Sequence, residues 1–233
     1  RGSRGKPIVN MLQLDDKERI NAVLPIREFD DKSFVFMVTS NGTVKKTSLN
    51  QFSRPRSNGI KAIDLRDQFL VDVAITNGDN DILLTASNGK AIRFSEKDVR
   101  SMGRTASGVR GIRIDKNDEV ISLCILDDGL LLTATENGFG KRTNIHEFSN
   151  QHRGGKGVIA IQTSDRNGKA VAALQVKDDD EIMLISSNGT LVRTSVSDIS
   201  IIGRNTQGVK LIKLQDKQRL VGLAKIEYIE GED

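Results

Sequence analysis

Basic side chains recur at one fixed position of this 233-residue sequence. They lie four residues after the glycine of a repeated Asn-Gly dipeptide: Lys46, Arg93, Arg142 and Arg193. Guanidinium and ammonium groups bind phosphate oxygens through charge-assisted hydrogen bonds. A cation that returns once per repeat would therefore bind a polyanion at regularly spaced points along its backbone.

Two further basic positions flank a second recurring glycine, one four residues before it and the other two residues after it. Duplex DNA is the polyanion that suits this pattern, because phosphate contacts give affinity that tolerates any base sequence. With their basic neighbours, these positions define the candidate DNA-binding residues: Arg1, Arg4, Lys6, Lys45, Lys46, Arg54, Arg56, Lys61, Lys90, Arg93, Arg100, Arg104, Arg110, Arg113, Lys141, Arg142, Arg153, Lys156, Arg193, Arg204, Lys210 and Lys213.

The charge of the chain is segregated by position in the repeat, although the formal net charge is only +4. Residues 1–10, 43–63, 90–113, 139–161 and 190–213 together hold 23 basic and 4 acidic residues, whereas the rest of the chain holds 12 basic and 27 acidic residues. A single basic run is usually a solvated face, but repeated exclusion of acids from one position indicates a nucleic-acid interface. The small number of aromatic residues, 8 Phe and 1 Tyr, argues against a surface that stacks the bases of single strands.

The acidic residues gather in short turns: Asp15–Asp16, Asp79–Asp81, Asp127–Asp128 and Asp178–Glu181. These turns lack the ligand spacing and the turn glycine of a calcium-binding loop. We interpret them as solvated turns that repel DNA and keep it on one face of the molecule.

We expect no catalytic chemistry in this chain. The two histidines, His146 and His152, and the one cysteine, Cys124, do not make up a zinc site. The glycine-rich segment Arg153–Gly157 lacks the Ser or Thr that follows in a phosphate-binding loop. Tyr228 has acidic neighbours instead of the cations that a nucleophile for DNA cleavage would need, and we interpret it as an edge-strand residue.

The elements that position the cations follow from an internal repeat. A segment centred on the Asn-Gly dipeptide, as in TSNGTVKKT or SSNGTLVRT, recurs at spacings of 47, 49 and 51 residues, and we call it the first anchor. A second anchor, as in SGVRGIRI or QGVKLIKL, follows each first anchor after 17 to 19 residues. A period of about 50 residues indicates a repeat architecture.

Each repeat is expected to form four β-strands. Runs rich in β-branched and aromatic residues precede the first anchors: residues 34–39, 82–86, 130–135 and 182–186. The Asn-Gly dipeptide then suits a type I′ hairpin, and two more strands are expected after the second anchor, for example at 108–114 and 120–126. Four strands per period are typical of a propeller blade, whereas a solenoid would show longer stretches of 3.6-residue periodicity.

One helical turn is expected between the two anchors of each repeat. Residues of good N-cap type lie six positions after the first glycine: Ser48, Ser95, Asn144 and Ser195. An apolar residue follows ten positions after the same glycine and could pack the turn against the blade: Phe52, Val99, Phe148 and Ile199.

Several strings closely resemble the C-terminal domain of the bacterial DNA gyrase A subunit, part of a type IIA topoisomerase. They are ISIIGRNTQGV (199–209), SRGKPIVNML (3–12), NGTVKKT (41–47), GVRGIRI (108–114) and TATENGFGKRT (133–143), and the resemblance covers essentially the whole chain. It implies a β-pinwheel, an all-β propeller variant of usually six blades with strands exchanged between neighbours. We expect about five four-stranded blades in a single domain over 1–228, with a partial repeat at 1–33 and full repeats at about 34–81, 82–129, 130–181 and 182–228; residues 229–233 would begin an acidic tail.

The sequence departs from the family pattern in two ways. The family's signature box, Gln-Arg-Arg-Gly-Gly-Lys-Gly, normally lies in the first blade. Here a near copy lies in the third full repeat at Gln151–Gly157, with His152 in place of an arginine, and we expect it to serve as an equivalent DNA contact. The chain starts downstream of the expected first blade, which indicates a truncation or an atypical member and calls closure of the ring of blades into question.

The resemblance implies a non-catalytic domain that binds, bends and positively wraps duplex DNA, and so supports ATP-dependent negative supercoiling. The implied partners are duplex DNA, the N-terminal breakage-reunion part of the same subunit, and the gyrase B subunit in an A2B2 complex, while the isolated domain is expected to be monomeric. No cofactor or metal is expected in the domain, with ATP and Mg confined to the holoenzyme.

We expect a cytoplasmic, nucleoid-associated location, because no apolar run is long enough to cross a membrane and a single cysteine excludes an intrachain disulfide. Two alternatives stay open. One is the equivalent domain of topoisomerase IV. The other is a propeller that binds proteins, which the absence of Trp argues against.

Overall fold

Short antiparallel strands joined by tight turns build the fold, which a computed structural model describes for residue 14 and residues 18–226. The strands are β1 (Phe34–Thr39), β2 (Thr43–Ser48), β3 (Leu70–Thr76), β4 (Asp81–Ala86), β5 (Lys90–Ser95), β6 (Val109–Arg110), β7 (Val120–Leu126), β8 (Leu130–Thr135), β9 (Phe139–Asn144), β10 (Val158–Ile159), β11 (Ala170–Val176), β12 (Glu181–Ser186), β13 (Leu191–Ser195), β14 (Val209–Lys210) and β15 (Leu220–Ile226). The short 3-10 helices are η2 (Leu49–Phe52), η3 (Glu96–Asp98), η4 (Ile145–Glu147) and η5 (Val196–Asp198).

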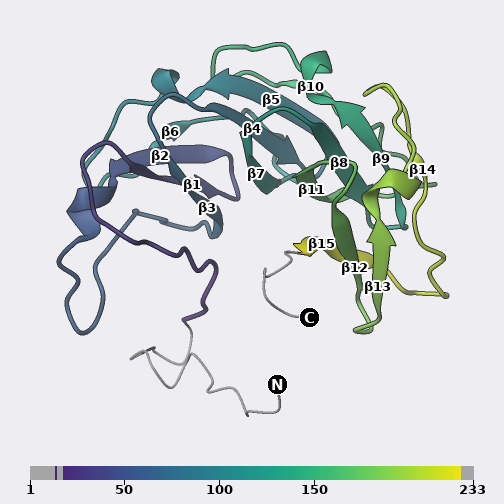
Figure 1. The fold of residues 1–233 in the computed structure, drawn as a ribbon, viewed down its shortest axis with the longest axis horizontal. Coiled ribbons are helices and arrows are strands. Elements are labelled where there is room, and N and C mark those ends of the chain that lie inside the picture. Colours follow the sequence, from purple (N-terminus) through teal and green to yellow (C-terminus); the bar gives the residue numbers. More distant parts are fainter. Residues whose placement is uncertain (1–13, 15–17, 227–233) are drawn as a thin grey trace.

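Within the described residues these strands form four antiparallel sheets. We name them sheet 1 (order β3-β1-β2-β6), sheet 2 (β10-β5-β4-β7), sheet 3 (β11-β8-β9-β14) and sheet 4 (β13-β12-β15). Figure 1 shows the sheets following one another along an arc, with β3, β7, β11 and β15 in contact along its inner side. The predicted all-β, propeller-like fold class is therefore confirmed.

The outer strand of each four-stranded sheet comes from the following repeat. β6 lies beyond η3 of sheet 2, yet it pairs with β2 of sheet 1, where Val109 is opposite Val44. The pairs β10 with β5 and β14 with β9 repeat this exchange. Strand exchange between neighbours, which the resemblance implied, is thus present at all three junctions between described sheets.

The predicted strand at 108–114 is wrong in length, because only Val109–Arg110 forms a ladder. After Arg110 the amides of Gly111 and Ile112 both donate to the carbonyl oxygen of Gly42, at 2.8 and 3.2 Å, and this draws the chain out of the strand. The two anchors therefore meet in space, one from each of two consecutive repeats, which explains why both recur.

The hairpin turns are not of type I′, because that type requires positive φ at both central residues and only the glycines have it. In the first repeat the Gly42 amide donates to the Thr39 carbonyl at 2.9 Å, and Gly42 has a φ of 83°. The Asn41 carboxamide instead accepts from the Thr43 amide at 3.1 Å. This is a four-residue turn closed by a left-handed glycine, with Asn as a side-chain acceptor.

Apolar side chains from facing sheets fill three inter-sheet cores. Phe36 and Val44 of sheet 1 pack with Ile82 and Ile92 of sheet 2, and all four are fully buried. Equivalent cores lie between sheets 2 and 3 and between sheets 3 and 4. The first hairpin strands β1, β4 and β8 are buried on both faces, so they occur as apolar runs in the sequence.

The predicted helical turns are present as η2 to η5, and their N-caps are the predicted Ser48, Ser95, Asn144 and Ser195. Side-chain capping hydrogen bonds are found at Ser95 and Asn144. Of the predicted packing residues, Val99, Phe148 and Ile199 are buried.

The described residues form four blades, whereas about five were expected. The additional blade was assigned to 1–33, of which 1–13 and 15–17 lie outside the described residues, and residues 18–33 form no strand. Sheet 4 has three strands within the described residues, and in the other sheets the fourth strand comes from the following repeat. The limits of a single domain over 1–228 stay a prediction, and the acidic tail from 229 lies outside the described residues.

Candidate nucleic-acid interface

Each outer sheet edge carries a loop from the following repeat. The loop that leaves η3 runs parallel to β2, where Ser101 bridges to Lys46, and continues into β6. The same path is repeated by Asn150 beside Arg93 and by Ile201 beside Arg142. Residues 99–113, 148–161 and 199–212 therefore cover the outer edges of sheets 1, 2 and 3; we call them the rim loops.

Most of the exposed candidate cations lie on the rim loops or directly after them. Sheet 1 carries Arg100, Arg110 and Arg113 on its edge, sheet 2 carries Lys156, and sheet 3 carries Lys210 and Lys213; the equivalent loop of the first repeat carries Arg54, Arg56 and Lys61. Lys61 is partly neutralised, because its Nζ lies 2.9 Å from Asp64 and this hydrogen bond lowers the pKa of the Asp64 carboxyl.

The candidates four residues before the second glycine are half-buried: Arg104, Arg153 and Arg204. Arg153 donates from Nε to the Asp98 carbonyl at 2.9 Å and from Nη1 to the Arg110 carbonyl at 3.1 Å. Arg204 donates from Nη1 to the Ile159 carbonyl at 3.2 Å. The Arg153 and Arg204 guanidinium groups thus connect neighbouring rim loops and leave only part of their surface for a ligand. Lys90 is likewise half-buried.

Lys45 and Lys141 do not belong to an exposed basic surface, because both side chains are completely buried. The Lys45 Nζ donates to the Ala62 carbonyl at 2.6 Å, and the Lys141 Nζ donates to the Gly203 carbonyl at 2.5 Å. Burial disfavours the charged form and lowers the pKa of each ammonium group to about 8. Their assignment as direct phosphate contacts is corrected on this ground.

Three of the four cations that lie four residues after the first glycine are also not on the open rim, contrary to the sequence-based expectation. Lys46 and Arg142 are buried, and Arg93 has a side-chain exposure of only 22%. Carboxylates pair with them: Glu96 with Lys46, Asp81 with Arg93 and Asp178 with Arg142. The side chain of Arg193 is exposed and pairs with Glu181, a hydrogen bond that lowers the pKa of the Glu181 carboxyl. The remaining candidates, Arg1, Arg4 and Lys6, lie outside the described residues.

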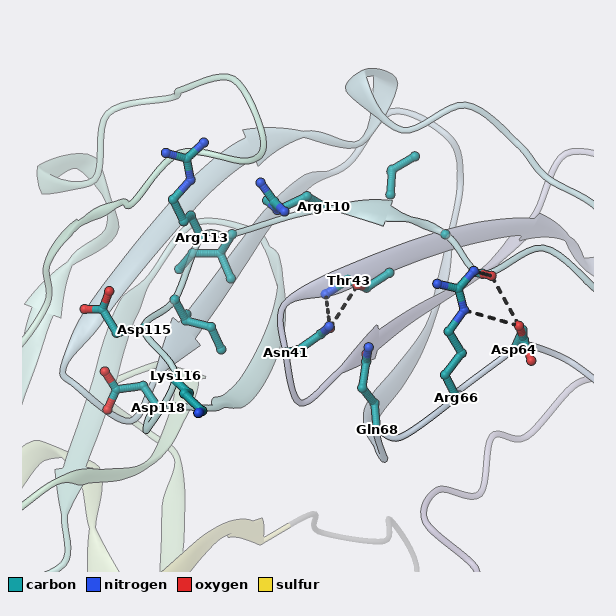
Figure 2. A pocket seen from close by; sticks show the side chains of 15 residues that line it. Asn41, Thr43, Asp64, Arg66, Gln68, Arg110, Arg113, Asp115, Lys116 and Asp118 are labelled. Atoms are coloured by element: carbon teal, nitrogen blue, oxygen red, sulfur yellow. Dashed lines mark hydrogen bonds and ion pairs between the residues drawn. The ribbon is translucent and has the colours of Figure 1, made fainter.

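Sequence reasoning missed a cleft of about 670 Å³ beside the sheet 1 edge. Figure 2 shows Arg110 and Arg113 on one wall and Arg66 on the other, while Lys116 lies near its end. Arg66 stands in the turn that follows the second anchor, and the same turn carries a cation in every repeat: Arg66, Lys116, Arg166 and Lys217. This recurrence is visible in the sequence, but acidic neighbours in the same turns conceal it.

The acidic turn Asp79–Asp81 lies at the opposite strand ends from the hairpin turn of sheet 1, since Phe34 at the start of β1 is paired with Thr76 at the end of β3, whereas Asp15–Asp16 lies outside the described residues. Among the described residues, no group of three or more His, Cys, Asp and Glu is placed to hold a metal ion. Over the same range no helix has the length and apolar character needed to cross a membrane.

The glycine-rich segment Gln151–Gly157 is packed into the rim of sheet 2. The Gly155 carbonyl accepts from the Arg113 amide at 2.7 Å, and a Cβ on Gly157 would lie 2.3 Å from the Ala91 carbonyl oxygen. Gly157 is therefore needed for close backbone approach, and Lys156 is the exposed cation of the segment.

Comparison with known proteins shows where this architecture occurs. A family profile described as the DNA gyrase C-terminal domain, beta-propeller, matches residues 1–27, 33–77, 80–123, 129–177 and 180–227. The DNA gyrase A subunit of Salmonella typhimurium is 50% identical over 236 residues, which cover 100% of this chain and 27% of that protein. The Pseudomonas aeruginosa protein of the same name is 44% identical over 278 residues, covering 100% of this chain and 30% of that protein.

Solved structures share the fold. A DNA gyrase A C-terminal domain superposes with a TM-score of 0.86 at 26% identity, covering 97% of this chain and 76% of that one. The C-terminal domain of a DNA topoisomerase IV superposes with a TM-score of 0.90 at 28% identity, covering 96% and 71%. The chain spans only about a quarter to a third of the length of its curated relatives. With a family profile that matches nearly all of its residues, the chain belongs to the DNA gyrase A C-terminal domain family.

Proposed function

We propose that this chain is a non-catalytic domain that binds duplex DNA along its rim loops and bends it around the arc of sheets. One observation carries the proposal: exposed cations occupy the outer edges of three consecutive sheets, and these edges follow a curve (Figure 1). A duplex in contact with all three edges has to bend. Smooth bending of a 20–30 bp site costs about 1–6 kcal/mol, which several phosphate contacts can offset.

In the longer protein, this bend would contribute the positive DNA wrap that supports ATP-dependent negative supercoiling. The wrap would be delivered to the breakage-reunion part of the same polypeptide, which would work with gyrase B subunits in an A2B2 complex at the nucleoid. ATP and Mg would be bound elsewhere in that complex. The fold is shared with a topoisomerase IV domain at 28% identity and so does not distinguish the two enzymes. The relative named as a DNA gyrase A subunit, at 50% identity, supports the assignment to gyrase.

The test compares two triple variants that each remove three positive charges. Arg110→Gln/Lys156→Gln/Lys210→Gln removes one exposed cation from each of three sheet edges, whereas Lys32→Gln/Lys97→Gln/Lys177→Gln removes exposed cations near the acidic turns. Duplex affinity is measured at 50 and 200 mM salt. If 6–10 phosphates are contacted, the parent loses about 10³–10⁵-fold in affinity between these conditions. The rim variant should bind more weakly and with a shallower salt slope than the control variant.

Ligation of nicked circular DNA in the presence of the protein then measures the wrap. A positive shift of the topoisomer distribution supports the proposal. An unshifted distribution together with weak, salt-insensitive duplex binding would instead favour a propeller that binds proteins.

A further inference from the structure

The cation that follows the first anchor connects each sheet to the next. At the first junction, Lys46 extends from β2 of sheet 1 to Glu96, which begins η3 of sheet 2. The Lys46 Nζ donates to the Glu96 carbonyl at 3.1 Å and lies 3.6 Å from its carboxylate. That carboxylate is itself fully buried and accepts from the Thr76 hydroxyl at 2.6 Å, so the contact is fixed from both sides.

The second junction has the same design with an arginine. Arg93 extends from β5 of sheet 2 and donates from Nη1 to the carbonyl of Phe148, the C-cap residue of η4 in sheet 3, at 3.3 Å. Its Nε and Nη2 groups bind the Asp81 carboxylate at 2.9 and 2.6 Å, which fixes the orientation of the guanidinium plane.

The third junction carries the largest number of these bonds. Arg142 extends from β9 of sheet 3 and donates from Nε to the Ile199 carbonyl at 2.6 Å and from Nη2 to the Ser197 carbonyl at 3.2 Å. Both acceptors belong to the η5 turn of sheet 4 or its C-cap. Nη1 also pairs with Asp178, in the turn that joins sheets 3 and 4.

The backbone of each cation holds a rim loop at the same time. The carbonyl of Lys46 accepts from the Met102 amide at 2.8 Å, that of Arg93 from the Gln151 amide at 2.8 Å, and that of Arg142 from the Ile202 amide at 2.9 Å. One residue per junction therefore joins three parts: its own sheet, the next sheet, and the loop that carries the exposed rim cations.

Apolar packing and these bonds contribute differently to the junctions. The inter-sheet cores hold the sheets together, but hydrophobic attraction is non-directional and does not by itself select one angle between them. Hydrogen bonds from a planar guanidinium to carbonyl oxygens weaken steeply when the angle changes. Because the Lys46 and Arg142 side chains are only 8% and 6% exposed, water cannot easily replace the bonds that a rotation would break.

We propose that Lys46, Arg93 and Arg142 are positioning residues that fix the angle between consecutive sheets and so set the curvature of the rim. The inference rests on the proposed DNA bending for its functional consequence, although the angle itself is a property of the free protein. The recurrence of a cation at this position is then explained by the repeated junction, with phosphate contact left to the exposed rim cations.

The test uses Arg142→Met and Lys46→Met, which keep an apolar stem and remove the donors. Lys97→Met is the matched control, because it removes the same positive charge from a solvent-exposed ion pair. The Lys97 side chain in that pair is 65% exposed and the Asp79 side chain is 69% exposed. Arg142→Lys keeps the charge but not the planar fork. Thermal unfolding identifies any variant that fails to fold, and only folded variants are compared further.

Spin labels at Gln51→Cys in η2 and Thr190→Cys in the sheet 4 hairpin report the span of the arc in the free protein by pulsed electron paramagnetic resonance. Cys124 is buried and should not take the label. Arg142→Met and Lys46→Met should broaden or shift the distance distribution, Arg142→Lys should do so less, and Lys97→Met should leave it unchanged. A distribution that is unchanged in Arg142→Met would overturn the inference.

Two DNA measurements distinguish an effect on the angle between sheets from a direct contact of Arg142 with phosphate. On a duplex of about 15 bp, too short to bend appreciably, the affinity of Arg142→Met should stay within about two-fold of the parent. The linking-number change per bound protein should fall by about two-fold or more, and Lys97→Met should change neither quantity. Loss of short-duplex affinity with an unchanged linking number per bound protein would mean that Arg142 contacts phosphate. If the parent itself produces no linking-number change, DNA wrapping fails, while the spin-label distances still decide the inference.

Discussion

The Nζ of Lys141 lies 2.5 Å from the carbonyl oxygen of Gly203, the residue that precedes Arg204 in the rim loop of sheet 3. Lys45 makes a similar contact one residue further along the rim loop of sheet 1, where its Nζ donates to the carbonyl oxygen of Arg104. Two rim loops are therefore held from beneath by buried ammonium groups. In sheet 2 the equivalent position is occupied by Ile92, so this support is not repeated there.

The buried lysines predict a pH dependence of stability. Burial lowers the pKa of Lys141 to about 8 from the ordinary lysine value of 10.5, so between these pH values the unfolded chain binds more protons than the folded one. The free energy of unfolding should rise as the pH increases through this window. In Lys141→Met the rise should be clearly smaller, because Lys45 alone of the two buried lysines remains, while the raised pKa of the buried Cys124 thiol opposes the rise above about pH 9 in both proteins. Urea unfolding at a series of pH values from 7 to about 10.5 measures the slope, and an equal slope in both proteins would contradict the assignment.

Close backbone contact between repeats predicts unequal costs of alanine at two equivalent glycines. A Cβ on Gly89 would lie 2.1 Å from the Ile161 carbonyl oxygen, whereas a Cβ on Gly189 has no neighbour within 4 Å. Both glycines have positive φ, which should cost about 1–2 kcal/mol in each variant. Gly89→Ala should lose about a further 1–3 kcal/mol because the rim loop must move. Denaturant midpoints measure both values, and equal losses would count against the contact.

The single cysteine is expected to be inert in the folded protein. Burial raises the pKa of the Cys124 thiol to about 12, and its Sγ lies against the Ala173 carbonyl oxygen in the core between sheets 2 and 3. The thiolate is the form of cysteine that attacks a thiol reagent, so labelling at pH 8 should be slow. It should accelerate sharply at the urea concentration where the chain unfolds. Fast labelling of the native chain would show that this core opens locally.

The outer edge of sheet 4 predicts a gradient of amide protection. β9 is paired on both sides, with β8 and β14, whereas β13 is paired only with β12 among the described strands. Leu191, at the start of β13, is also 59% exposed. Hydrogen exchange measured by mass spectrometry should therefore be faster in peptides covering 191–195 than in those covering 139–144. Equal protection would mean that another segment covers this edge.

Fold class and strand positions could be predicted from the sequence because the same pattern occurs in each of the four full repeats. β1 and β8 begin and end at the predicted residues, since a buried apolar run and an Asn-Gly turn mark both ends. The prediction of a type I′ turn was wrong because the Asn41 side chain accepts a hydrogen bond from the Thr43 amide, which a dipeptide preference does not reveal.

The site was harder to predict, because a recurring Lys or Arg has the same appearance whether it binds a ligand or joins two sheets. Arg110 and Arg142 both recur at a fixed position, yet Arg110 is exposed on a sheet edge and Arg142 is buried against η5. What separates them is the neighbouring repeat in space. Arg142 meets the Asp178 carboxylate and two carbonyl oxygens of sheet 4, which lie 36 to 57 residues further along the chain.

Strand exchange also sets the order in which the sheets can be completed during synthesis of the chain. Sheet 1 begins at Phe34, but its outer strand is Val109–Arg110, so a ribosome must synthesise most of the second repeat before the first sheet can be completed. Every described four-stranded sheet has the same delay. During synthesis each of these three sheets therefore keeps one unpaired edge until the next repeat supplies its strand.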